Sequence, residues 1–204
     1  MSPGITFERV YRELKRRLAE GEFRPGMAIE PATLGADLDA SVTPIRDALH
    51  RLVGERLVQA PEHDGFRVPR PTETELRDLY AWNDCLLAVA TRRLIRPAPP
   101  APSGPDHPIR ERTASLFQAI AACTANPEHS DAIRQMNDRL APYRTAEAAS
   151  LPNLGEEIEE IQARLAGGDR AMLKRALARY HRRRHDAAPH ILRIAIRPLP
   201  PASA

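Results

Sequence analysis

The sequence has little cysteine, few aromatic residues and no long hydrophobic run. Its two cysteines, Cys85 and Cys123, form no C-x-x-C pair, so neither a disulfide framework nor a zinc knuckle is predicted. Aromatic residues make up 4% of the chain and hydrophobic residues 42%, which favours an aliphatic core of packed helices. No apolar run approaches the roughly 18 residues that span a bilayer, and the N-terminus lacks a signal-peptide pattern. We therefore expect a soluble, cytoplasmic protein.

Charge and motif content narrow the function classes. Lys and Arg number 30 against 27 Asp and Glu, and this mildly basic balance permits a polyanionic partner without requiring one. No Ser/His/Asp order, glycine-rich phosphate loop or carboxylate pair stands in a motif context. The sequence therefore predicts a protein that is not an enzyme and needs no cofactor.

The first 69 residues carry the pattern of three helices followed by a β-hairpin. Apolar residues at four-residue steps predict a helix over 7–19, Pro31 opens a second helix ending near Asp39, and Ser41 can cap a third that runs to about Gly54. Two β-prone runs, 57–60 and 66–68, flank an Asp-Gly turn. This order predicts a winged helix-turn-helix.

The rest of the chain predicts an all-helical domain. Thr72 and Glu75 have the spacing of a capping box, and a helical stripe follows them. Further helices are expected over 108–124, 127–141, 154–166 and 170–187. Five prolines within 97–105 exclude helix and sheet there. The predicted fold class is mainly α: a winged helix-turn-helix with a small β-hairpin over 1–69, an antiparallel helical bundle over 72–196 with a proline-rich loop at 97–108, and a tail over 197–204.

The third helix and the hairpin carry the candidate DNA contacts. A recognition helix presents its first turns to base edges, and short hydroxyls at a helix N-terminus suit a phosphate. The candidates are Ser41, Val42, Thr43, Arg46 and His50 on the helix, with His63, Gly65 and Arg67 on the wing. The alternative to DNA contact is that Ser41 and Thr43 only cap the helix and that Arg46 is a solvated surface arginine. The basic run at 12–17 is typical of a solvated helix face.

Three stretches in this order resemble the GntR-type winged helix-turn-helix: Phe23-Arg24-Pro25-Gly26, Ser41 to Leu49, and Asp64 to Val68. The helical remainder resembles the FCD (FadR-C-like) effector domain of that family in a shortened, degenerate form, with Asn126-Pro127 and 166–169 at inter-helix positions. The resemblance implies a DNA-binding transcriptional regulator, in the first instance a repressor, that binds an inverted repeat as a homodimer and responds to a small organic effector. The alternative is a dimeric architectural or protein-interaction factor without an effector.

The sequence also departs from the family pattern. Members typically carry arginine where this chain has Val42, and often where it has Ala32. The Asp and three His that hold a metal in many FCD domains correspond to Ala114, Gln118, Ile158 and Tyr180, so no metal is predicted. His181 and His185 have a zinc-chelating spacing, but several arginines around them favour a solvated helix end. The candidate effector pocket comprises Trp82, Asn83, Gln118 and Tyr180.

Overall fold

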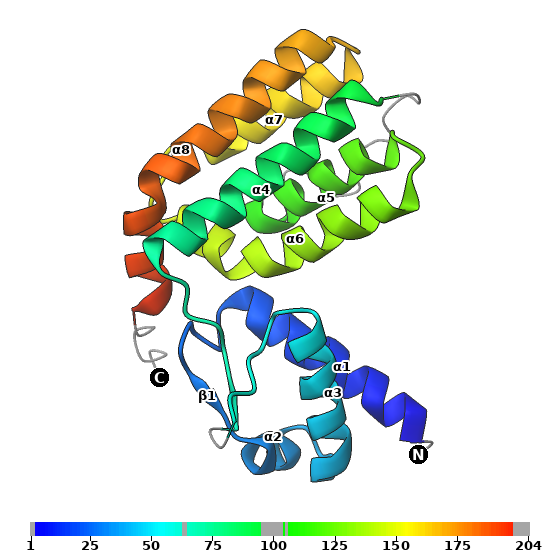
Figure 1. Cartoon of the computed structure of the whole chain (residues 1–204), viewed down its shortest axis with the longest axis vertical. Coiled ribbons are helices and arrows are strands. Elements are labelled where there is room, and N and C mark those ends of the chain that lie inside the picture. Colours follow the sequence, from blue (N-terminus) through cyan, green and yellow to red (C-terminus); the bar gives the residue numbers. More distant parts are fainter. Residues whose placement is uncertain (1–2, 63–64, 95–103, 105, 198–204) are drawn as a thin grey trace. The chain divides into compact units, whose positions relative to one another are not determined.

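The computed structural model describes residues 3–62, 65–94, 104 and 106–197. The chain divides into two compact units between Pro71 and Thr72, and residues from Thr72 to Ile194 form the second unit (Figure 1). Within the described residues, no helix is both long and apolar enough to cross a membrane.

The first unit is built on three helices that share one apolar core. They are α1 (Pro3–Glu20), α2 (Pro31–Asp37) and α3 (Val42–Gly54), and α3 packs against both of the others. Val10, Leu14 and Leu18 of α1 supply the core at four-residue steps. The buried side of α3 is Ile45, Ala48, Leu49 and Leu52. Val53, near the end of α3, is only half-buried.

The β-structure of the first unit differs in part from the predicted hairpin. Gln59 and Arg67 pair as expected, but as a single bridge with backbone N···O distances of 2.8 and 2.9 Å. On its other edge, β2 (Phe66–Arg67) pairs antiparallel with β1 (Ala28–Ile29), which was not predicted. Only four residues separate Gly26 from Pro31, a run too short to show the alternation of a strand.

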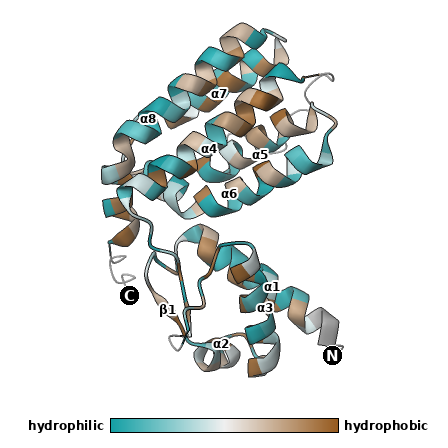
Figure 2. Cartoon of the chain, in the orientation of Figure 1, coloured by the Kyte–Doolittle hydropathy of each residue, from teal (hydrophilic) through white to brown (hydrophobic). Residues whose placement is uncertain are grey.

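The second unit is an antiparallel bundle of five described helices: α4 (Glu73–Arg92), α5 (Ile109–Ala122), α6 (Pro127–Glu147), α7 (Leu154–Ala166) and α8 (Arg170–Ile196) (Figure 1). Its core is mostly aliphatic, and Figure 2 shows hydrophobic residues along α4 and α5. The mainly α fold class is confirmed. Of the predicted proline-rich loop at 97–108, only Gly104 and residues 106–108 lie within the described residues.

The start of α4 agrees with its predicted capping box, but the ends of α6 and α8 differ from the predicted ones. The capping box of α4 is present, because Thr72 accepts from the Glu75 backbone and Glu75 binds the Thr72 backbone in return. The expected ends of α6 and α8 near residues 141 and 187 are wrong, since both helices continue through an internal proline, Pro142 and Pro189. An interior proline costs about 3 kcal/mol. The turns beyond each proline bury apolar side chains that offset this cost: Tyr143, Ala146, Ile191 and Leu192.

Lys15, Arg16 and Arg17 of the basic run in α1 are paired with nearby carboxylates. Glu13 bonds Arg16 at 2.8 Å and Arg17 at 2.9 Å, and Lys15 bonds Glu55 at 3.1 Å. Hydrogen bonds from Arg16 and then Arg17 lower the pKa of Glu13 from 4.5 to about 2. A pKa lowered by folding means that the ionised carboxylate stabilises the fold above pH 4.5, and that this contribution is lost as the pH falls toward 2.

We therefore predict that Glu13→Gln lowers the melting temperature at neutral pH, by about 1 kcal/mol or less in stability because the pairs are partly exposed. The difference from the wild type should shrink as the pH falls from 4.5 toward 2 in a calorimetric pH series. Glu62→Gln is the matched control, since Glu62 is exposed and has no ion pair among the described residues. A difference that is constant with pH would contradict the charge explanation.

Candidate DNA interface

The solvent-facing side of α3 presents polar side chains at helical spacing. Thr43, Arg46, Asp47 and His50 are all exposed, and steps of three and four residues place them on one face. Among the described residues, Arg46 has no hydrogen bond or ion pair, in contrast to the paired arginines of α1. Arg51, one position beyond His50, instead lies 4.0 Å from the Tyr11 ring centre and 3.3 Å from Glu8. The free cation of this face is therefore Arg46.

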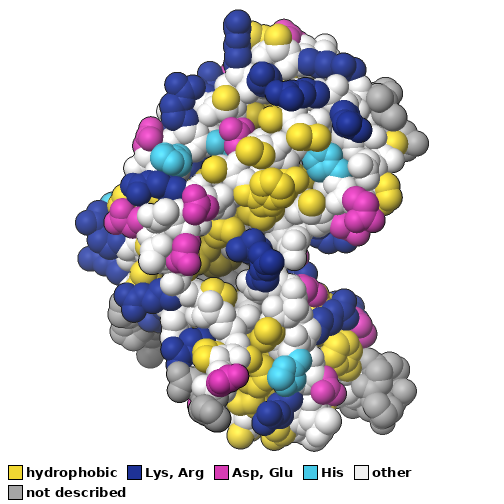
Figure 3. Space-filling view, viewed as in Figure 1, with side chains coloured by type: hydrophobic (Ala, Val, Ile, Leu, Met, Phe, Trp, Pro, Cys, Tyr) yellow, Lys and Arg dark blue, Asp and Glu magenta, His cyan; other side chains and the backbone are white. Residues whose placement is uncertain are grey.

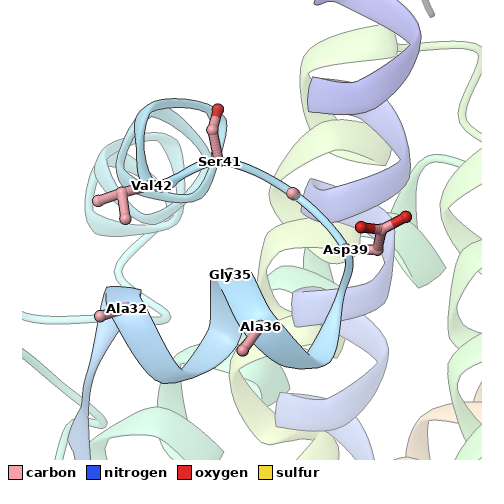
Figure 4. Close-up of a pocket in the computed structure, with 7 residues that line it drawn as sticks. Ala32, Gly35, Ala36, Asp39, Ser41 and Val42 are labelled. Carbon is pink, nitrogen blue, oxygen red and sulfur yellow. The ribbon is translucent and has the colours of Figure 1, made fainter.

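The N-terminus of α3 opens onto a shallow groove beside α2 (Figure 4). Ser41 is the N-cap residue, but its side chain makes no capping hydrogen bond. Pro44 occupies the third helical position and has no N–H to donate to it. The Ser41 hydroxyl and the first-turn N–H groups thus remain available to an anion. Small side chains line the groove and leave its floor open: Ala32, Gly35, Ala36 and Ala40.

The turn between α2 and α3 is fixed by a close backbone approach and by α1. A side chain at Gly35 would place its Cβ 2.8 Å from the Ala40 carbonyl oxygen. Asp39 takes a positive φ of 47°, which aspartate tolerates better than most residues. Arg9 of α1 donates to the carbonyl oxygens of Leu38 at 2.8 Å and Asp39 at 3.3 Å. Sequence reasoning missed Arg9, because a long-range bond to a helix end leaves no local pattern.

The wing residues flank the same helix. The ring of Phe66 in β2 lies 5.0 Å from that of His50, edge to face, so the wing and the recognition face share a contact. Gly65 is exposed with φ of 68°, a conformation that suits glycine, and Arg67 is half-buried with its backbone paired on both strand edges. His63 lies outside the described residues.

This geometry coincides with a family match. Residues 6–68 match the model described as bacterial regulatory proteins, gntR family. The matched segment lies within the first unit. The HTH-type transcriptional repressor GlaR of Escherichia coli K12 is 37% identical over 70 residues, which are 34% of this chain and 32% of that protein. The HTH-type transcriptional regulator McbR of the same strain is 24% identical over 160 residues, covering 78% of this chain and 68% of McbR. The match to GlaR thus spans about a third of that relative.

Solved structures of gntR-type regulators share the fold over nearly the whole chain. E. coli McbR/YncC aligns with a TM-score of 0.64 and 21% identity over 93% of this chain and 98% of that one. A putative transcriptional regulator GntR from Rhodococcus sp. RHA1 aligns with a TM-score of 0.68 and 20% identity over 91% and 97%. At these identities the likeness establishes the fold.

The predicted effector residues of the helical unit do not all lie in its interior. Asn83 and Tyr180 are buried and Gln118 is half-buried, but Trp82 is 54% exposed. Neighbouring helix positions point about 100° apart, so burying Asn83 turns Trp82 outward. Gln118 donates to the Ser130 carbonyl at 3.1 Å.

The metal set typical of FCD domains does not fit this interior. Ala114 and Ile158 have no ligating atom, and the described residues contain no group of three His, Cys, Asp or Glu able to hold a metal. Both ring nitrogens of His181 are engaged, Nδ1 with the Leu177 carbonyl at 2.8 Å and Nε2 with the Asn83 amide at 2.9 Å.

The close approach of the Ala40 carbonyl oxygen leaves no room for a side chain at Gly35. Gly35→Ala should destabilise the first unit, because overpacking against a backbone carbonyl costs about 1–3 kcal/mol and exceeds the helix-propensity gain of up to about 1 kcal/mol. Gly54→Ala is the matched control, since Gly54 also lies in a helix and has nothing within 4 Å of an added Cβ. Denaturant unfolding measures both variants, and equal stabilities would contradict the close approach.

Proposed function

We propose that the chain is a DNA-binding transcriptional regulator that inserts α3 into the major groove. The observation that carries this proposal is the exposed face of α3 with its unpaired Arg46, within the segment that matches the gntR family. The proposed DNA partner supports a cytoplasmic location. Repression, in place of activation, remains a prediction, and GlaR, a relative of the N-terminal segment, is described as a repressor.

Some side chains on the exposed face of α3 suit contacts with base edges, and others suit contacts with phosphates. A major groove about 12 Å wide admits a helix, and Arg46 can donate two parallel hydrogen bonds to a guanine edge. Val42 is 43% exposed and offers an apolar side chain that can contact a thymine methyl group. Ser41 and Thr43 suit a phosphate, and Gly65 and Arg67 extend the contact to the backbone.

The helical unit supplies a surface for a second copy. Leu79, Trp82, Leu86 and Val89 recur along α4 at steps of three and four residues, the spacing of a helix–helix seam. Trp82 and Val89 are 54% and 45% exposed, and hydrophobic side chains gather over α4 in Figure 3. We propose a homodimer through this face. A twofold dimer would present two α3 helices and so bind an inverted repeat.

We expect Arg46 to contribute to the sequence specificity of DNA binding. Arg46→Ala should weaken binding to the operator by about 1–3 kcal/mol, or roughly 5–150-fold, with little change for scrambled DNA. Fluorescence anisotropy with both DNAs at several salt concentrations measures this difference. Arg12→Ala is the matched control, because Arg12 is an exposed cation on α1 that bonds only the Glu8 carbonyl among the described residues. Equal losses on both DNAs for Arg46→Ala would contradict base recognition.

We expect Val89 to lie in the interface of the proposed homodimer. Val89→Glu should shift the protein toward monomer, because a seam that buries a carboxylate without a partner is strongly disfavoured. Ala81→Glu adds the same charge at an exposed site on a different face of α4 and should leave the mass unchanged. Light scattering over a concentration series measures the mass, and circular dichroism checks the fold. A dimer that survives Val89→Glu would place the interface elsewhere.

A further inference from the structure

Val42, the first residue of α3, presents a hydrophobic side chain on the proposed DNA-binding face. It is 43% exposed, whereas Ile45 and Leu49 of the same helix are fully buried. Arg46 follows four residues later, so the side chains of Val42 and Arg46 project from the same side of α3, one turn apart. Base edges that meet Arg46 in the major groove therefore lie next to an apolar group as well as a cation.

The groove beside the start of α3 continues this apolar surface (Figure 4). Four of its lining residues carry no more than a methyl group: Ala32, Gly35, Ala36 and Ala40. The other three are Val42, Ser41 and Asp39, and Figure 4 shows Asp39 at the end of the groove away from Val42. None of the seven lining residues, all of which the structure describes, has the amide or guanidinium group that binds a base edge through two hydrogen bonds.

One kind of base edge offers an apolar group in the major groove. Thymine carries a C5-methyl group there, and 5-methylcytosine carries the same group at the same position, whereas guanine, adenine and unmodified cytosine present hydrogen-bond donors and acceptors. Contact with valine and alanine would remove water from those polar atoms without replacing its hydrogen bonds, which is unfavourable. Contact with a methyl group buries apolar surface on both sides, which is favourable. The surface around Val42 therefore suits a C5-methyl group.

The spacing of Val42 and Arg46 limits where this methyl group lies in the operator. Four residues of α-helix advance about 6 Å along the helix axis. Successive base pairs are about 3.4 Å apart along the DNA. The bases that the two side chains contact are therefore separated by about two base pairs or fewer.

We propose that Val42 is a specificity-determining residue that recognises the C5-methyl group of a pyrimidine in each operator half-site, within about two base pairs of the guanine contacted by Arg46. The contact contributes about fourfold to the affinity in each half-site, the value expected for burial of one methyl group. This inference deepens the proposed function and rests on it, because it requires that α3 enters the major groove. Thymine and 5-methylcytosine share the recognised chemistry, and the experiment distinguishes them.

The test begins with selection of bound sequences from a random duplex library by the full-length protein. Each thymine of the selected operator is then replaced by uracil, which pairs in the same way and lacks only the methyl group. Fluorescence anisotropy should show about fourfold weaker binding for one thymine in each half-site, and about 15-fold weaker binding when both are replaced. That thymine should lie within about two base pairs of the guanine whose replacement weakens binding by the wild type but not by Arg46→Ala.

Val42→Ala supplies the decisive comparison, because it shortens an exposed side chain and leaves the core intact. This variant should bind the thymine operator more weakly and lose the difference between thymine and uracil, as expected for two groups in direct contact. Met27→Ala is the matched control, since Met27 is 46% exposed in the same unit and does not line the groove. Met27→Ala should keep the difference, and circular dichroism checks the fold of both variants.

A second pair of operators distinguishes the two methylated bases. The sensitive thymine is replaced by cytosine or by 5-methylcytosine, each paired with guanine. Tighter binding of the 5-methylcytosine operator, lost in Val42→Ala, would show that the methyl group is recognised on either base. Equal binding of these two operators, with the uracil effect present, would assign the contact to thymine alone.

Two outcomes overturn the inference while the regulator function stands. One is a consensus operator in which no uracil weakens binding by the wild type. The other is a uracil effect that persists unchanged in Val42→Ala, which would place methyl recognition elsewhere. A selection that enriches no common sequence contradicts the proposed function itself, and the inference with it. The selection and the base replacements thus distinguish the two failures.

Discussion

The packing of α3 on α1 is the contact on which the proposed interface depends. Ile45, Ala48 and Leu49 are fully buried in one core with Val10 and Leu14, so the helix cannot rotate without exposing them. The steps of three and four residues that bury this side turn the opposite side, with Arg46, to solvent. Arg9 and the close approach at Gly35 then fix where the exposed N-terminus of α3 begins. Apolar packing therefore sets the orientation, and a few polar side chains supply the contact.

The sequence predicted those helices and caps of the fold that have a local pattern. Periodicity located α1 and α3, and the spacing of Thr72 and Glu75 predicted the capping box. It missed β1, whose short run has no pattern, and it ended α6 and α8 at prolines that tertiary burial overrides. It also placed Trp82 in the candidate effector pocket, and this side chain is 54% exposed. The burial of Arg144 without a carboxylate could not have been found from the sequence, because only tertiary packing shows which arginine lies in the core.

The first unit has an unpaired arginine on its surface, whereas the second has one in its core. In α1, Arg16 and Arg17 are paired with Glu13, whereas Arg46 on the recognition face has no ion pair among the described residues. In the bundle, Arg184 is paired from two sides while Arg144, equally buried, is not. An exposed cation costs little to leave unpaired, whereas a buried one is expensive. The exposed Arg46 is therefore suited to reversible contact with a polyanion.

Hydroxyl-radical footprinting of the protein on the DNA that flanks its own gene tests the central claim most directly. Insertion of α3 from a twofold dimer predicts protection of an inverted repeat with half-sites about one helical turn, roughly 10 base pairs, or a multiple of it apart. The protection should persist at salt concentrations that remove non-specific binding. Uniform, sequence-independent protection that disappears steeply with added salt would contradict recognition by α3.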